Sequence, residues 1–236
     1  MKKGDVSFGK VFGESWNLLW SRIGLFASLG LLFSFLPGII FAIWDRSRTS
    51  FIIDGVIPSI GDIFMEVKIL APWIFGLWIF STFLAVCIIY ILNNGTKKKV
   101  IDFGAAMKGG WSFYGKALLL GLLLFVFLVP LYCLLIIPGI VFQIYWMFAV
   151  YVLVAENKSI MKSLKRSHEI VKGRWWKAFG YMLLFYVIVG ITGAMFDGLF
   201  SFIGMVGIFL GVIVTTLISI FSLIFVNSFY LSLKRK

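Results

Sequence analysis

The stretch ALLLGLLLFVFLVPLYCLLIIPGIVFQIYWMFAVYVLVA, from Ala117 to Ala155, decides the fold class. It has 39 residues and no charge. About 20 apolar residues are enough for a helix to cross the hydrocarbon core of a bilayer, so this stretch is too long for one crossing and suits two. Ile137-Pro138-Gly139 lies near its middle, where proline disrupts a helix and glycine permits a turn. We therefore predict a helical hairpin, with helices from Ala117 to about Ile136 and from Ile140 to Ala155.

Further apolar stretches flank this hairpin. Ile23–Trp44 and Ile69–Leu92 come before it, and each is long enough for one crossing. The run Ala178–Leu231 follows it and contains a single charge, Asp197, near its middle. We read Asp197 as a loop residue between two spans, at about 178–196 and 205–231. The predicted total is six transmembrane helices.

The composition supports the same class. Hydrophobic residues make up 61% of the chain and charged residues 14%, whereas a soluble domain has about 45–50% and about 25%. Such a chain cannot cover its apolar residues as a water-soluble globule, and it is not typical of a disordered or disulfide-stapled protein. We predict an all-α, polytopic membrane protein, a single transmembrane domain over residues 1–236, with its six helices arranged as three hairpins.

The distribution of basic residues predicts the orientation. Six spans place both termini and the 93–116 and 156–177 connections on one side. That side carries 19 of the 22 Lys and Arg residues. Basic residues remain preferentially in the cytoplasm. We therefore expect both termini in the cytoplasm and the chain in the plasma (inner) membrane of a prokaryote. The three basic residues on the other side are Arg46, Arg48 and Lys68.

Three segments of the sequence are similar to one another. They are FGKVFGESWNLLWSRIGLFASLGLLF from Phe8, FGAAMKGGWSFYGKALLLGLLLF from Phe103 and IMKSLKRSHEIVKGRWWKAFGYMLLF from Ile160. Each precedes a predicted hairpin. We predict three repeats, at about 8–92, 103–155 and 160–231, each consisting of an amphipathic helix at the membrane surface followed by a transmembrane hairpin.

The third segment has the clearest helical pattern. Residues 160, 164, 168 and 171 fall on one face of a helix, and the charged side chains point elsewhere. A helix with an apolar face and a lysine-rich face suits the headgroup region of a bilayer. A basic and aromatic cluster follows Gly173, of a kind common at membrane interfaces. The candidate contact residues are Lys162, Lys165, Arg166, Lys172, Arg174, Trp175, Trp176 and Lys177.

This basic stretch has three interpretations. It can be a positive-inside anchor, it can bind anionic lipid headgroups, or it can dock a cytoplasmic protein partner. Because the basic residues lie between apolar spans, the membrane surface is the expected partner and nucleic acid is not.

Residues for catalysis are scarce. His168 is the one histidine and takes the place of Trp16 and Trp111 in the repeat, so we interpret it as an interfacial ring. Cys87 and Cys133 lie within apolar runs and are interpreted as packing residues. The sequence contains no nucleotide-binding or nucleophile-elbow motif. We expect no metal, no cofactor and no enzymatic activity.

Transport is the alternative. Gln143 and Asn227 are polar residues within predicted spans and could line a cavity between the hairpins. Their simpler interpretation is a hydrogen bond between helices. Gly204, Gly207 and Gly211 are three to four residues apart, and we expect them to permit close helix packing.

The stretch IPGIVFQIYWMFAVYVLVAENKSIMKSLKRSHEIVKGRWWKAFGYMLL, residues 137–184, resembles the most characteristic part of a group of prokaryotic membrane proteins. The group includes the YciC-like proteins and the membrane domain attached to some glycerophosphoryl diester phosphodiesterases. In it, an Ile-Pro-Gly turn leads to a span, an acidic residue (here Glu156) and a basic helix, and His168 stands where the group usually has Trp. The resemblance implies a six-span fold and no activity, because 236 residues leave no room for the phosphodiesterase catalytic domain.

The leading hypothesis is thus a non-catalytic membrane protein that engages anionic lipid or a partner through its basic cytoplasmic face. The alternative is a small transporter or lipid-moving protein with a cavity between the hairpins. The sequence leaves open whether segment 45–68 forms a cap on the outer surface.

Overall fold

The computed structural model describes residues 7–46, 59–95 and 101–234. Over these ranges the chain consists of helices and the turns that join them, without a strand, so the prediction of an all-α fold is confirmed. In chain order the elements are α1 (Phe8–Ser21), α2 (Ile23–Gly30), the π-helix η1 (Leu31–Phe35), α3 (Leu36–Arg46), α4 (Ile60–Asn94), α5 (Phe103–Leu134), α6 (Ile136–Trp146), α7 (Ala149–Ala155), α8 (Ile160–Val171), α9 (Trp175–Phe200), the 3-10 helix η2 (Ser201–Ile203) and α10 (Gly204–Lys234).

Five helical segments of the described chain are long and apolar enough to cross a membrane. The last of them has 60 residues and includes both α9 and α10. This result supports the predicted multi-pass membrane protein. The segments are Ile23–Asp45, Ile60–Asn94, Phe103–Leu134, Ile136–Ala155 and Trp175–Lys234.

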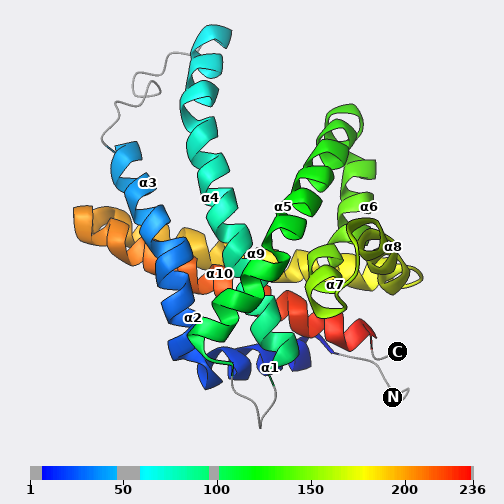
Figure 1. The fold of residues 1–236 in the computed structure, drawn as a ribbon. Helices are drawn as coiled ribbons and strands as arrows, with labels where there is room; N and C mark the ends of the chain where they lie inside the picture. The colour runs from blue at the N-terminus through cyan, green and yellow to red at the C-terminus, as the bar shows by residue number, and fades with distance from the viewer. Residues whose placement is uncertain (1–6, 47–58, 96–100, 235–236) are drawn as a thin grey trace.

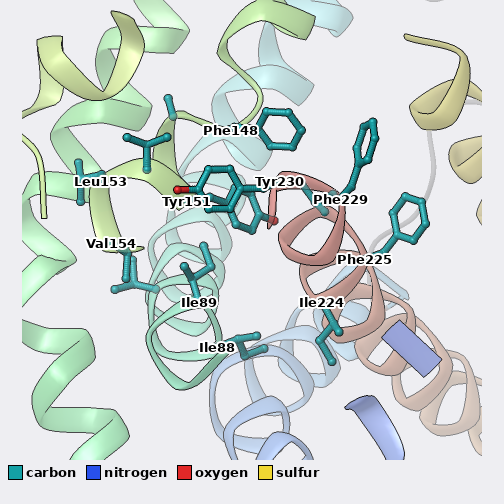
Figure 2. Close-up of a cluster of buried hydrophobic side chains, with 14 of the residues drawn as sticks. Ile88, Ile89, Phe148, Tyr151, Leu153, Val154, Ile224, Phe225, Phe229 and Tyr230 are labelled. Atoms are coloured by element: carbon teal, nitrogen blue, oxygen red, sulfur yellow. The ribbon is translucent and has the colours of Figure 1, made fainter. Parts of the chain in front are cut away.

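The hydrophobic core is formed by parts of several helices rather than by their whole lengths. It comprises the C-terminal part of α4, the N-terminal half of α5, all of α7 and the C-terminal half of α10, with contributions from α1, α2, α8 and α9. Figure 2 shows Ile88 and Ile89 of α4 close to Tyr151 of α7 and to Ile224 and Tyr230 of α10. In Figure 1, α4 and the α5–α6 pair extend away from the region that holds α1, α7 and the C-terminus.

The remaining halves of the long helices are exposed and apolar. Phe64 on α4 is 65% exposed, Phe125 on α5 is 65% exposed and Phe202 in η2 is 89% exposed. In water this surface would be costly, whereas lipid tails solvate it as well as another apolar helix would. The exposed halves are therefore expected of a chain that folds in a bilayer.

Glycines bring α4 and α5 close together. A Cβ atom on Gly110 would lie 2.4 Å from the Sγ atom of Cys87, and one on Gly121 would lie 2.8 Å from the Trp78 ring. Tyr114 adds a hydrogen bond, since its hydroxyl donates to the carbonyl oxygen of Ile79 at 3.1 Å. This glycine-lined contact was not predicted from the sequence.

The second predicted surface helix is not a separate element. The sequence predicts a surface helix at the Phe103 segment and a span from Ala117, but α5 runs without interruption from Phe103 to Leu134. The first and third surface helices do end before the next helix begins. α1 is followed by a turn at Arg22, and α8 is followed by Gly173, which has a φ of 79°.

Several predicted boundaries need correction. α4 begins at Ile60 rather than Ile69, because Ser59 and Asp62 form a capping box. The turn between α5 and α6 is at Leu135, so Pro138 lies in the first turn of α6. The predicted span Ile140–Ala155 is interrupted at residues 147–148, between α6 and α7.

The end of α9 also differs from the prediction. Asp197 lies within α9 rather than in a loop, and the chain turns at Gly204, which has a φ of 58°. A Cβ atom on Gly207 would lie 1.9 Å from the carbonyl oxygen of Phe200, so the predicted close packing is confirmed at this glycine. Of the possible cap 45–68, residues 47–58 lie outside the described residues. They include Arg48, one of the basic residues on which the predicted orientation rests.

Candidate functional site

The candidate site is built on α8, whose limits are set by two residues with positive φ. Asn157 has a φ of 49° and ends the preceding segment, and asparagine tolerates this conformation better than most residues. Gly173, at 79°, allows the chain to leave α8 and enter α9. α8 therefore lies between α7 and α9 as a short, separate helix.

The buried face of α8 is rotated slightly from the predicted one. The sequence pattern places residues 160, 164, 168 and 171 on the apolar face. In the structure Leu164 and Val171 are buried as expected, whereas Ile160 and His168 are half-buried. The buried set also includes two hydroxyls; its members are Ser163, Leu164, Ser167, Ile170 and Val171.

Ser167 bridges the interruption between α6 and α7. Its Oγ atom accepts a hydrogen bond from the backbone N–H of Phe148 at 3.2 Å and donates one to the carbonyl oxygen of Tyr145 at 2.7 Å. A helix break within an apolar segment leaves backbone groups that water cannot satisfy. Ser167 meets that requirement, and the hydroxyl holds α8 against the break.

His168 lies beside the same break. Its ring stacks on Tyr145, with ring centroids 4.2 Å apart and an interplanar angle of 23°. The structure thus places His168 against an aromatic ring, and its interpretation as a ring at the membrane interface stays a prediction. Within the described ranges, no group of three or more His, Cys, Asp or Glu side chains is placed to hold a metal ion.

Four of the eight predicted contact residues are exposed. Lys162 and Lys165 point away from the buried face of α8, and Lys172 follows at its end. Trp176, in the first turn of α9, is 79% exposed. These four residues, which we call the α8 surface, are available to a membrane or a partner.

The other four predicted residues make internal contacts. Arg174 donates from Nη1 to the carbonyl oxygen of Leu233 at 2.9 Å, so it satisfies a carbonyl in the last turn of α10. Trp175 donates from Nε1 to the carbonyl oxygen of Val141 at 3.3 Å. The ammonium group of Lys177 lies 5.4 Å from the centre of the Tyr181 ring. Arg166 forms ion pairs, described next, so this half of the predicted set supports the fold.

Glu156 is the centre of a polar cluster that was not predicted as a site from the sequence. Its carboxylate pairs with Lys158 at 2.8 Å, Lys234 at 3.1 Å and Arg166 at 3.8 Å. It also accepts a hydrogen bond from the hydroxyl of Tyr230 at 2.8 Å. We call these five residues the Glu156 cluster. It joins the end of α7, the middle of α8 and the end of α10.

The cluster keeps Glu156 ionised. Burial raises the pKa of its carboxyl, but hydrogen bonds from Lys158, Tyr230 and Lys234 and the charge of Lys234 outweigh burial and lower the pKa to about 2. The sequence held one signal for this cluster: the pattern that resembles the YciC-like group includes an acidic residue at Glu156. Its partner Tyr230, however, is 74 residues further along the chain, a distance that spacing rules cannot bridge.

The two residues considered for a transport cavity both form hydrogen bonds. Asn227 is 1% exposed, and its Oδ1 accepts from Nδ2 of Asn93 on α4 at 2.8 Å. Gln143 is exposed, and its Oε1 accepts from the hydroxyl of Tyr132 across the α5–α6 pair. The simpler interpretation, a hydrogen bond between helices, therefore describes both.

Three hollows in the described part of the structure are mostly apolar and lie between helices. One of about 210 Å³ lies where α1, α9 and α10 meet and is lined by Trp16, Trp20 and Phe221, among others. Another, of about 320 Å³, lies between α3 and α4 beside Trp73. A third, of about 300 Å³, includes Asp197 and Thr215. Neither Gln143 nor Asn227 lines any of these three.

Comparison with known protein families places most of the chain in a family. The model of a family described as a domain of unknown function (DUF7847) matches residues 23–233. No curated protein and no solved structure matches the chain. The resemblance of residues 137–184 to the YciC-like group therefore stays a prediction.

Proposed function

The chain belongs to the DUF7847 family, and we propose that it is a non-catalytic integral membrane protein that binds anionic lipid headgroups through the α8 surface. The single observation that carries the proposal is the exposure of Lys162, Lys165, Lys172 and Trp176 beside the buried, anchored face of α8.

The proposal includes the arrangement of the chain in the membrane. It has six spans in three hairpins, with α9 and α10 crossing separately, and the three hairpins are related as sequence repeats. Both termini and the α8 surface face the cytoplasm, in the inner membrane of a prokaryote. The turn at Gly204 and the packing of α9 on α10 support the third hairpin.

The physical argument for lipid rests on charge and depth. A lysine close to an anionic bilayer surface gains about 1 kcal/mol from its surface potential. Tryptophan rings prefer the headgroup level, so Trp176 would hold these lysines at that depth. The positive-inside anchor requires only positive charge on this side, whereas lipid binding requires the charges to be exposed together. A cytoplasmic protein partner is the competing use of the same surface.

The test changes the three lysines of the α8 surface to glutamine. The full chain, purified in a non-ionic detergent, is mixed with equal amounts of phosphatidylglycerol and phosphatidylcholine, and bound lipids are counted by native mass spectrometry. We expect the unchanged chain to retain phosphatidylglycerol about tenfold better, equivalent to about 1.4 kcal/mol. The K162Q/K165Q/K172Q variant should lose most of this preference.

A matched control removes three exposed cations elsewhere. Lys10 on α1 and Lys108 and Lys116 on α5 are also exposed, so K10Q/K108Q/K116Q changes the net charge equally. We expect this control to keep most of the preference. An equal loss in both variants would indicate general positive-inside anchoring, and an unchanged preference in the α8 variant would favour a protein partner.

A lipid-moving protein is the second candidate. The observation that favours it is the apolar hollow between α1 and the α9–α10 pair, where Trp16 and Trp20 line a space suited to an acyl chain. Transfer of a labelled lipid between the leaflets of proteoliposomes would distinguish this activity from binding alone.

A further inference from the structure

In the Glu156 cluster, one lysine contacts each of the two oxygens of the carboxylate. Lys158 contacts Oε2 of Glu156 at 2.8 Å, and Lys234 contacts Oε1 at 3.1 Å. Lys158 comes from the connection before α8, whereas Lys234 is in the last turn of α10. Two ammonium groups from distant parts of the chain thereby contact the same carboxylate.

The carboxylate lies beneath the cations. The Glu156 side chain is 12% exposed, whereas Lys158 and Arg166 are each 35% exposed and Lys234 is 38% exposed. An ammonium group has three N–H donors, and the contact with Glu156 occupies one of them. Each lysine therefore keeps donors that can face outward.

Two buried polar atoms on the adjoining part of α8 have no hydrogen-bond partner among the described residues. They are Nε of Arg166, which is 3.8 Å from Glu156 and beyond hydrogen-bond distance, and Oγ of Ser163. Buried polar atoms without a partner are uncommon in folded proteins, and an ordered water or a bound ion is one explanation for them. Arg166 thus adds an unsatisfied donor to the cluster.

The charges around the cluster favour an anion. Three cations surround Glu156, and Glu169, which is 48% exposed, pairs with Arg166 at 3.3 Å on α8. The cluster with Glu169 keeps one net positive charge, and Lys162 and Lys165 on the same helix add two more. Paired ammonium groups bind phosphate oxygens through charge-assisted hydrogen bonds.

We propose that Lys158 and Lys234, held in place by Glu156, bind the phosphomonoester headgroup of a lipid of the phosphatidic acid type. This inference rests on the proposed function, the binding of anionic lipid at the α8 surface, and adds to it a neighbouring pair of lysines that select one class of headgroup. A phosphomonoester carries a charge of about −1.5 to −2 at pH 7, whereas a phosphodiester carries about −1. Two ammonium groups held on the two oxygens of the Glu156 carboxylate discriminate between a phosphomonoester and a phosphodiester better than separate surface lysines do.

The experiment compares two anionic lipids on the full chain. Equal amounts of phosphatidic acid and phosphatidylglycerol are added to the detergent-purified protein, and the bound ratio is measured by native mass spectrometry. We expect a ratio of about ten in favour of phosphatidic acid for the unchanged chain. The K158Q/K234Q variant should bring the ratio close to one.

The matched control is K162Q/K165Q, which removes two charges from the α8 surface. It should reduce the binding of both lipids and leave their ratio unchanged, so failure of the proposed function is distinguishable from failure of this inference. If K158Q/K234Q does not fold, the single variant K158Q leaves Lys234 to pair with Glu156 and should give an intermediate ratio.

Two results would overturn the inference. One is an equal uptake of the two lipids by the unchanged chain, and the other is a ratio that persists in K158Q/K234Q or K158Q. Inorganic phosphate, added in competition, identifies the source of the phosphate group. If inorganic phosphate displaces phosphatidic acid, the two lysines also bind free phosphate. If it does not, they require the phosphate group to be part of a lipid. Both results support recognition of the phosphate group.

Discussion

Glu156 connects three helices through one carboxylate. Its contacts reach Arg166 on α8 and Tyr230 and Lys234 on α10, while its own backbone ends α7. A partly buried carboxylate is stable only when its hydrogen bonds and ion pairs outweigh the loss of water. The cluster satisfies this requirement with two lysines and a hydroxyl, and we expect the C-terminal end of α10 to depend on it.

The pKa of Glu156 predicts how stability depends on pH. The value is lowered from 4.5 to about 2, so the ionised carboxylate stabilises the folded state above about pH 4.5. That contribution is lost as the pH falls from 4.5 towards 2. At pH 7 we expect Glu156→Gln to reduce the free energy of unfolding by about 1.5–3 kcal/mol, and the difference from the unchanged chain should shrink towards pH 3. Thermal unfolding in detergent, followed by tryptophan fluorescence, measures both.

Glu169→Gln is the matched control for this pH series. Glu169 is 48% exposed and forms its ion pair with Arg166, and exposed pairs contribute about 0–1 kcal/mol. Its substitution should have little effect at either pH. A gap between E156Q and the unchanged chain that is the same at pH 7 and pH 3 would contradict the assigned role of the ionised carboxylate.

At the residue scale, helix periodicity predicts which side chains are exposed but not which groups the others bond to. Lys162 and Lys165 are exposed, as their positions on the charged face of α8 predict. Arg174 and Trp175 belong to the same predicted set, yet they bond to carbonyl oxygens of α10 and α6. Those acceptors are distant in sequence, so only the tertiary structure assigns these two residues to the fold.

At the element scale, local signals account for some helix ends and miss others. The Ser59–Asp62 capping box is readable in the sequence and explains the early start of α4. The break between α6 and α7 has no such signal, because neither proline nor glycine lies between Tyr145 and Ala149. It depends on Ser167, which comes from another helix. The second surface helix was predicted because its segment is similar in sequence to the other two. In the structure it does not end before the span, because α5 continues through Gly115 and Lys116.

The contact between α4 and α5 predicts a substitution and its rescue. Gly110→Ala places a Cβ atom 2.4 Å from Sγ of the buried Cys87, and overpacking of this kind costs about 1–3 kcal/mol. Cys87→Ala removes the sulfur and leaves Cβ of residue 87 at 3.6 Å, an ordinary contact distance. The double variant C87A/G110A should therefore regain most of the stability lost in G110A.

The same thermal unfolding measurement checks this rescue. Gly115→Ala serves as the control, because a Cβ atom there meets nothing within 4 Å and the position is exposed. We expect it to be neutral or slightly stabilising. If C87A/G110A is no more stable than G110A, close packing at Gly110 is not what holds α4 and α5 together.

At the scale of the whole molecule, the core and the exposed arms require different surroundings. Residues 83–91 of α4 are mostly buried, whereas the first part of the same helix is mostly exposed and apolar. The apolar composition predicted a membrane protein without indicating this uneven packing, because hydropathy does not distinguish lipid-facing from protein-facing residues. The family match covers the whole of this architecture except its first helix and its ends.

The number of times the chain crosses the membrane decides on which side each terminus lies. The positions of the two termini therefore distinguish five crossings from six. The sequence predicts six spans, whereas the helices of the described residues give five long apolar segments, the last of which combines α9 and α10. If α9 and α10 cross separately, the crossings number six and both ends face the cytoplasm; if the pair crosses once, the two ends lie on opposite sides. In a chain with Cys87 and Cys133 changed to serine, we expect Phe202→Cys, at the 89% exposed tip between α9 and α10, to react in intact cells with a membrane-impermeant maleimide. Ser7→Cys and a cysteine added after Lys236 should react only after lysis. Labelling of either end in intact cells, or protection of F202C, would contradict the six-span arrangement.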